Sequence, residues 1–255
     1  MPLTFPSHAA AVLPLKLWRR RWFDGVALVI GSAAPDMPYS LEPYLHIRAH
    51  TWWGLVWFCV PVTLVLAALT RRAAPTVVAH LPSHPWLRDY AALSARRHRW
   101  WISVLSAYLG ALSHRLWDIV THPSIDEGTV RIAWLSTEVA GYPWYKVFHY
   151  GSTVAGGVAV AATAVHIGRT RWLLGDGPAP RLPARRWGPF WGATAAVWLP
   201  ALAVQPLLAW HTQLQVLVVR LLEAGCLGLL AGAAAAGLAW ALAGRRGAAT
   251  NAEAA

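Results

Sequence analysis

Apolar residues gather in five long runs, near residues 52–70, 100–121, 147–168, 189–210 and 215–243. Each run is close to the ~20 residues that an α-helix needs to cross the hydrocarbon layer of a membrane. The segments between them are short and richer in arginine, proline and glycine. The pattern predicts an all-α, polytopic integral membrane protein with about five transmembrane helices.

A shorter apolar stretch precedes these runs, within residues 22–35. Its apolar part covers about ten residues, too few to span the membrane, so we expect a short buried or re-entrant N-terminal helix. We find no water-soluble domain and expect one membrane domain over residues 1–243. The small, polar residues 244–255 are expected to form a disordered C-terminal tail.

The composition supports a membrane protein. Hydrophobic residues make up 56% of the chain and charged residues only 13%, against ~25% in soluble domains. A net charge of +11 also occurs in nucleic-acid-binding proteins, but here the basic residues lie in the short segments that report membrane topology. We therefore expect no nucleic-acid partner. Cys59 and Cys226 fall inside apolar runs and indicate no disulfide framework.

Three polar residues line up at the end of the second long run. His114, Asp118 and His122 are spaced at i, i+4 and i+8, which places them on one face of a helix, one turn apart. Pro123 then ends the helix. Ionisable groups inside an apolar segment are costly and mark functional sites by default, so this row predicts a metal or catalytic site. The alternative is that these side chains only cap or pack the helix.

Further candidates lie nearer the N-terminus. Asp36 follows Pro35 and precedes Pro38, so a stiff turn would fix the direction of its carboxylate. His8, His46 and His50 flank this turn along the chain. Each of these residues alone is more often a surface or turn residue than a ligand.

Five spans would place most of these candidates on one side of the membrane, the N-terminal side. Seven of the eleven histidines fall there: His8, His46, His50, His114, His122, His149 and His211. Basic residues are more frequent on the opposite side. By the positive-inside rule, we therefore expect a protein of the cell membrane whose N-terminal side faces away from the cytoplasm. The basic segment 71–99, which contains His80 and His84, is interpreted as a solvated loop.

The residues that carry these features resemble a known family. Residues 1–15, 31–36, 49–51, 113–123 (Ser-His-Arg-Leu-Trp-Asp-Ile-Val-Thr-His-Pro) and 149–156 look like the bacterial membrane family called domain of unknown function 4184. The resemblance covers roughly residues 1–240 and implies a multi-pass membrane fold, with no established activity.

The order of motifs is similar, more distantly, to membrane-bound metal-dependent hydrolases and zinc-dependent phospholipase C-type proteins. That resemblance implies a set of metal ligands: His8, Asp36, His50, His114 and Asp118. It also implies that His122 is a further ligand or a proton carrier.

The leading hypothesis is a membrane-embedded hydrolase that uses a divalent metal, with zinc favoured by the His/Asp donors. The ion would make a water molecule acidic enough to attack the substrate. Asp36 would bridge two ions or act as general base, and His122 would carry a proton. Arg115 would bind a phosphate at the helix mouth, whereas Arg220 is better explained by pairing with Glu223. The bilayer is the expected partner, and a lipid or other phosphoester is the expected substrate.

The same residues leave a second hypothesis open, a non-catalytic structural or scaffold membrane protein. Its His/Asp cluster would hold a structural metal or form a network that packs helices. The two hypotheses differ in the expected behaviour of Asp36→Asn. An enzyme would lose activity and retain its metal, whereas a structural site would lose folding with any ligand. Ser152 lacks the setting of a serine nucleophile and is interpreted as a helix cap.

Overall fold

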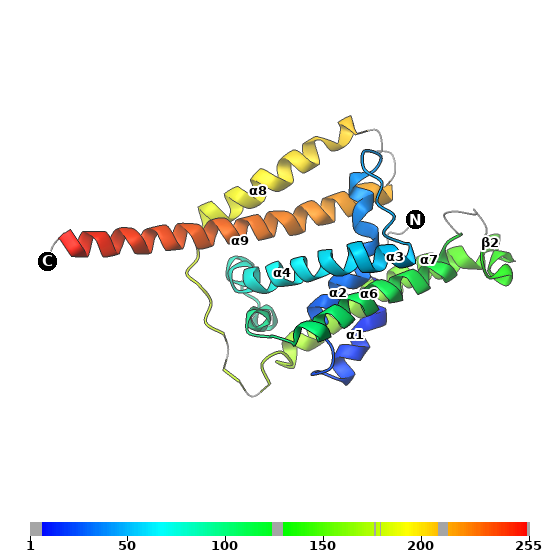
Figure 1. The fold of residues 1–255 in the computed structure, drawn as a ribbon, viewed down its shortest axis with the longest axis horizontal. Helices are drawn as coiled ribbons and strands as arrows, with labels where there is room; N and C mark the ends of the chain where they lie inside the picture. Colours follow the sequence, from blue (N-terminus) through cyan, green and yellow to red (C-terminus); the bar gives the residue numbers. More distant parts are fainter. Residues whose placement is uncertain (1–6, 124–129, 176, 179, 209–213, 254–255) are drawn as a thin grey trace. The chain divides into compact units, whose positions relative to one another are not determined.

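The computed structural model describes residues 7–123, 130–175, 177–178, 180–208 and 214–253 (Figure 1). This part of the chain is helical almost throughout, with one pair of two-residue strands. Its elements, in order, are α1 (Ala9–Trp18), α2 (Gly25–Ala33), η1 (Ala34–Leu41), α3 (Trp52–Gly54), η2 (Leu55–Cys59), α4 (Val60–His80), α5 (Pro85–Arg88), η3 (Asp89–Ser94), α6 (Trp100–Thr121), η4 (Ala133–Ser136), β1 (Glu138–Val139), β2 (Tyr142–Pro143), α7 (Trp144–Arg169), α8 (Trp187–Ala203), η5 (Gln205–Leu207) and α9 (Leu214–Glu253).

Four helical segments in the described chain are long and apolar enough to cross a membrane: Trp52–His80, Trp144–Arg169, Trp187–Leu207 and Val216–Gly244. They occupy four of the five predicted runs. The remaining run forms α6, a continuous helix of 22 residues. Its serines and the polar residues near its C-terminus lower the mean hydropathy of α6, so this helix is not among the four candidate spans. The all-α membrane fold predicted from the sequence is confirmed, with four candidate spans and a shorter apolar helix, α1.

The packing of the chain divides it into two compact units. The first unit contains residues 1–67, 98–164 and 212–219, and the second contains residues 68–97, 165–211 and 220–255. Helix α9 continues through residues 244–253, the segment assigned to the tail from its composition.

In the first unit, the start of α2 is tied to α6 by one buried carboxylate. Asp24 caps α2, because its Oδ1 accepts a hydrogen bond from the Ala27 N–H at 3.2 Å. The other carboxylate oxygen accepts a hydrogen bond from Ser103 Oγ at 2.5 Å, and the Asp24 N–H donates to Ser106 Oγ at 2.9 Å. Both serines belong to α6, so the cap that begins α2 also fixes its position along α6.

Two glycines allow the backbones of α2 and α6 to touch. A Cβ atom added at Gly31 would lie 2.4 Å from the carbonyl oxygen of Ala107, and one added at Gly110 would lie 2.4 Å from that of Leu28. Neither position can therefore hold a side chain without a backbone shift. Leu28 is fully buried in this contact. The short N-terminal helix predicted from residues 22–35 is thus a buried helix that packs on α6.

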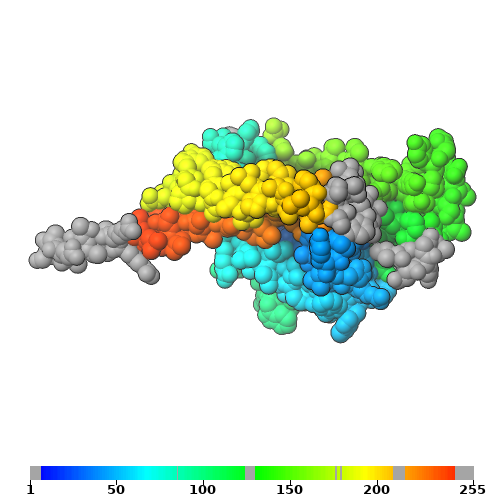
Figure 2. Space-filling view, turned by 90° about the horizontal axis from the view of Figure 1, so that it is seen from above, coloured from blue at the N-terminus to red at the C-terminus, as the bar shows by residue number. Residues whose placement is uncertain are grey.

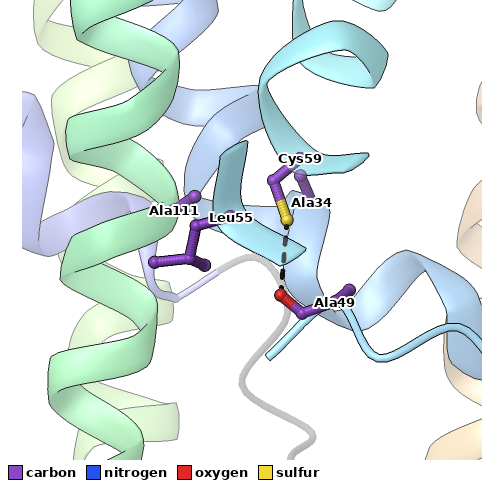
Figure 3. Packing of buried hydrophobic residues seen from close by; sticks show 5 residues of the cluster. All are labelled: Ala34, Ala49, Leu55, Cys59 and Ala111. Atoms are coloured by element: carbon purple, nitrogen blue, oxygen red, sulfur yellow. Dashed lines mark hydrogen bonds between the residues drawn. The ribbon is translucent and has the colours of Figure 1, made fainter. Parts of the chain in front are cut away.

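A small apolar cluster supports the segments that follow α2 (Figure 3). It contains Ala34, Ala49, Leu55, Cys59 and Ala111. The Cys59 thiol points at the carbonyl oxygen of Ala49, 3.8 Å away. Ala34 and Ala49 lie close along the chain to Asp36 and His50, so this packing holds the backbone that carries both polar residues.

In the second unit, α8 lies along α9, as both views show (Figures 1 and 2). Thr194 Oγ1 donates a hydrogen bond to the Gly228 carbonyl at 3.1 Å across this pair. Phe190 is fully buried and packs against Ala73, Ala233 and Ala236. Small residues at these contacts let the helices approach closely.

The interpretation of residues 71–99 as one solvated loop is wrong for its first third. Helix α4 extends to His80, which is 1% exposed. The His80 ring stacks on Phe190 with the ring centroids 4.2 Å apart. Its Nδ1 donates a hydrogen bond to the Thr76 carbonyl oxygen at 2.7 Å, and its Nε2 accepts one from the Arg186 backbone N–H at 2.8 Å. The arginine pair at 71–72 interrupts the apolar run, but the alanine-rich segment after it continues the helix and packs on Phe190. His80 is a satisfied core residue.

Candidate metal centre

The contact between α2 and α6 sets the orientation of His114. The imidazole is fully buried, and its Nδ1 donates a hydrogen bond to the carbonyl oxygen of Ser32 at 2.8 Å. This hydrogen bond uses Nδ1 and leaves Nε2, on the opposite edge of the ring, as the candidate ligand atom. Metal-binding histidines are commonly held in this way by an oxygen acceptor.

Asp36 meets this nitrogen from the 3₁₀-helix that follows α2. Its Oδ1 lies 3.3 Å from His114 Nε2 and 3.2 Å from His50 Nε2. The carboxylate is 1% exposed, and its Oδ2 is buried without a hydrogen-bond partner among the described residues. Pro35 and Pro38 are buried on either side of Asp36, as the predicted stiff turn requires.

Asp118 completes the group one helical turn after His114. Its Oδ2 lies 3.3 Å from His114 Nε2 and 3.5 Å from His50 Nε2. Four N···O distances of 3.2–3.5 Å thus join two imidazoles and two carboxylates. Ligand atoms on a tetrahedral zinc ion, each bound at 2.0–2.1 Å, are about 3.3 Å apart. Asp36, His50 and His114 each place one ligand atom within 4.8 Å of the others, so these donors could hold a divalent metal ion, with Asp118 close beside them.

His8 lies against the same group from the start of α1. Its ring stacks on that of His114 with centroids 3.9 Å apart, and it is 5% exposed. One ligand atom from each of His8, His114 and Asp118 lies within 4.8 Å of the others. Gly156 of α7 makes room for this segment, because a Cβ atom there would lie 2.8 Å from that of Ser7.

The electrostatics of the cluster suit a cation. Burial alone would raise the pKa of Asp36, but the imidazoles of His114 and His50 hold the pKa of that carboxyl well below its usual range. Burial, and then the neighbouring His114, lower the pKa of His8 to about 3. At neutral pH, Asp36 is therefore ionised and His8 neutral, the forms in which both bind metals.

His122 extends the row at the end of α6. Its Nδ1 lies 3.4 Å from Asp118 Oδ1 and 2.9 Å from Thr121 Oγ1. The ring of His149 is 4.7 Å away and nearly perpendicular to it. The three residues predicted to line one helix face, His114, Asp118 and His122, thus contact one another in sequence along α6.

A cavity of about 310 Å³ opens beside the cluster. Asp36, His50, Asp118 and His122 form part of its wall. Three arginines, one tyrosine and an ion pair lie among the other lining residues: Arg48, Arg115, Arg131, Tyr39, and Glu42 with His46. Burial, and then the carboxylates of Asp36 and Asp118, raise the pKa of Tyr39, so its hydroxyl stays protonated. The guanidinium of Arg115 lies over the ring of Trp52, 5.4 Å from its centroid.

The structure brings together all six side chains predicted as ligands: His8, Asp36, His50, His114, Asp118 and His122. Of the other histidines predicted for the same side, His46 pairs with Glu42 at 3.2 Å on the cavity wall. His211 lies outside the described residues. The interpretation of Ser152 as a helix cap is wrong, because it lies inside α7, where its Oγ accepts a hydrogen bond from Trp117 Nε1 at 3.1 Å.

Sequence reasoning did not single out Tyr39, Arg48 and Arg131 as cavity residues. It placed His149 on the same side as the other candidates and assigned it no role. Arg48 and Tyr39 are close along the chain to His50 and Asp36, and this proximity was the available signal. A lone histidine in an apolar run gives none.

These features define the class of the protein, a polytopic helical membrane protein with a buried His/Asp cluster beside a cavity. Residues 1–235 match the family described as domain of unknown function 4184 (DUF4184), and the chain belongs to this family. The resemblance to this family seen in the sequence is thereby confirmed. Comparison with curated proteins and with solved structures gives no match.

Proposed function

We propose that the protein is a membrane-embedded, metal-dependent hydrolase that acts on phosphoesters. The observation that carries the proposal is the cavity, which joins a wall of metal-ligand residues to three arginines. A metal that only stabilises the fold needs no cavity beside it, whereas a hydrolytic centre needs room for a substrate.

The donor set favours zinc. Two imidazoles and two carboxylates suit zinc or a similar transition metal, whereas magnesium and calcium prefer oxygen ligands alone. When bound, the ion would polarise a phosphoryl oxygen and make water acidic enough to attack near neutral pH. His50, His114, Asp36 Oδ1 and Asp118 Oδ2 would hold it, since each imidazole Nε2 lies 3.2–3.5 Å from both carboxylate oxygens.

The remaining polar groups have roles in handling protons and charge. Asp36 Oδ2, buried without a hydrogen-bond partner among the described residues, would accept the proton of the attacking water. His122 lines the cavity and was predicted either to ligate or to carry a proton. The guanidinium of Arg115 would bind a phosphate oxygen, and the Tyr39 hydroxyl would donate to another.

The depth of the cluster suggests a substrate at the level of lipid headgroups. The cavity residues 48–51 directly precede the candidate span Trp52–His80, and His149 lies in the second turn of the span Trp144–Arg169. Trp52 and Trp53 are 53% and 72% exposed, as expected for tryptophans at a membrane interface. We propose a lipid phosphoester in a cell membrane, with this face outside the cytoplasm.

The orientation has its own test. His46→Cys in a Cys226→Ser background should react with a membrane-impermeant maleimide in intact cells. Labelling that requires cell lysis would place this face in the cytoplasm.

The function is tested on detergent-purified protein by metal analysis and by hydrolysis of p-nitrophenyl phosphate, bis-p-nitrophenyl phosphate and phosphatidic acid in micelles. Wild type should retain zinc and hydrolyse at least one ester. Asp36→Asn should retain zinc and lose activity, whereas His114→Ala and Asp118→Ala should lose both.

Arg115→Ala should keep the metal and raise KM roughly 10–100-fold, the loss expected for a hydrogen bond to a charged group. His166→Gln, an exposed change in α7, is the control. Wild-type protein that binds no metal after reloading with zinc would contradict the proposal and favour the helix-packing network.

A further inference from the structure

Two histidine nitrogens beside the cluster lack a hydrogen-bond partner among the residues that the structure describes. His122 Nε2 and His149 Nδ1 are both buried and make no hydrogen bond within the part of the chain that the structure describes. His149 as a whole is 6% exposed. A buried polar atom without a partner is costly and requires an explanation.

The surroundings of His122 place its lone pair on Nε2. The Thr121 hydroxyl donates to the Trp117 carbonyl at 3.0 Å, so its oxygen accepts a hydrogen bond from His122 Nδ1 at 2.9 Å. Asp118 Oδ1, 3.4 Å from the same nitrogen, favours a proton there as well. This repeats the arrangement of His114, in which an acceptor fixes the Nδ1–H and leaves Nε2 to bind a metal.

The position of His149 is fixed from α6. Its backbone carbonyl accepts hydrogen bonds from Ser152 Oγ at 3.1 Å and from Thr153 Oγ1 at 2.8 Å. Ser152 Oγ in turn accepts a hydrogen bond from Trp117 Nε1. Trp117 therefore holds the turn that carries His149 next to the end of α6, where His122 lies.

The spacing of the two rings fits one shared ion. An imidazole nitrogen bound at 2.0–2.1 Å puts its ring centroid about 3.2 Å from the metal, so two imidazoles at 90–110° have centroids about 4.5–5.3 Å apart. The His122 and His149 centroids are 4.7 Å apart. The ring centroids of His50 and His114, which belong to the metal centre of the proposed function (the first centre), are 5.3 Å apart, in the same range.

We infer that His122 and His149 form a second metal position, which takes a divalent transition-metal ion through two histidine nitrogens. Asp118 links the two positions, since its Oδ2 faces the first and its Oδ1 orients His122 toward the second. Of the two roles predicted for His122, ligand and proton carrier, this assigns the ligand role. With two protein donors, the second position keeps coordination sites open for substrate and binds its ion more weakly than the first.

The inference rests on the metal centre of the proposed function and is independent of turnover. It is tested by equilibrium dialysis of the detergent-purified full chain against Co²⁺, with metal counted per chain and cobalt absorption bands recorded. Wild type should bind two ions, one of them at least tenfold more weakly. His149→Gln and His122→Gln should each bind one ion, and that ion should retain the tighter affinity.

The matched control is His166→Gln, which alters an exposed histidine of the same helix as His149 and should bind two ions. The ion retained by His149→Gln shows that the first centre is folded in that variant. One ion in wild type, or two in His149→Gln, would overturn the inference. No ion in a His149→Gln chain of unchanged melting temperature would do so too, because His149 would then belong to the first centre.

The outcomes also separate this inference from the proposed function. A chain that binds two ions and hydrolyses no ester would contradict the proposed function and leave the second position standing. A chain that hydrolyses esters and binds only one ion would support the proposed function and overturn the second metal position.

Discussion

His114 Nδ1 donates a hydrogen bond to the Ser32 carbonyl at 2.8 Å, from the middle of α6 to α2. The Nε2 edge of the imidazole, which faces Asp36 and Asp118, is thus oriented by a neighbouring helix. This bond exists only because Gly31 and Gly110 let the two backbones approach. Binding at the cluster should therefore depend on residues that cannot touch a ligand.

Gly110→Ala should weaken metal binding. The new methyl group would lie 2.4 Å from the Leu28 carbonyl oxygen and 2.7 Å from the Ser32 nitrogen, so α2 must move away from α6. We expect a loss of about 1–3 kcal/mol in stability, as for other overpacked contacts. Competition with a zinc chelator should show an affinity at least tenfold lower. Gly157→Ala is the control, because a Cβ atom there meets nothing within 4 Å. Equal affinities in the two variants would contradict this account.

Gly156→Ala should act on His8. The added Cβ would lie 2.9 Å from the Ser7 carbonyl oxygen, which displaces the segment that stacks His8 on His114. Metal affinity should fall toward that of His8→Ala, and combining the two changes should add little, because both remove the same contact. Gly157→Ala, the next residue along α7, again provides the comparison. Additive losses in the double variant would show that Gly156 acts elsewhere.

Asp24→Ala should destabilise the first unit. It removes the cap of α2 and leaves Ser103 of α6 without its acceptor. Loss of a cap costs about 0.5–2 kcal/mol, and the lost buried hydrogen bond adds to it. The melting temperature in detergent should fall markedly for Asp24→Ala and less for Asp24→Asn, which can still cap the helix. Equal melting temperatures in all three proteins would contradict a structural role for this carboxylate.

The metal-free protein should lose stability in acid through His8. Its pKa falls from 6.5 in the unfolded chain to about 3 in the folded protein. Below pH 6.5 the unfolded chain thus binds a proton that the folded chain does not, and stability falls as the pH drops toward 3. His8→Gln should reduce the fall in melting temperature over this window. An unchanged pH dependence in His8→Gln would show that the ring is not buried in the neutral form.

The helices and the heart of the site were accessible from the sequence because both are periodic features. Apolar runs report spans directly, and the spacing of His114, Asp118 and His122 reports one helix face. Contacts between residues that are far apart in the sequence were harder to predict. His149 reaches the cluster through the Trp117–Ser152 hydrogen bond, which no spacing reveals. His80 seemed to lie in a polar loop because its partner, Phe190, is more than a hundred residues away.

The position of His8 bears on how the protein is made. His8 leaves the ribosome about 150 residues before Gly156, the glycine that makes room for it. Contacts between such distant segments form late, because the intervening chain must first be in place. The segment that carries His8 is therefore expected to pack only after the helix carrying Gly156 has been inserted. If the cluster binds an ion as proposed, a half-inserted chain would hold that ion less tightly than the finished one, and metal affinity would report complete insertion.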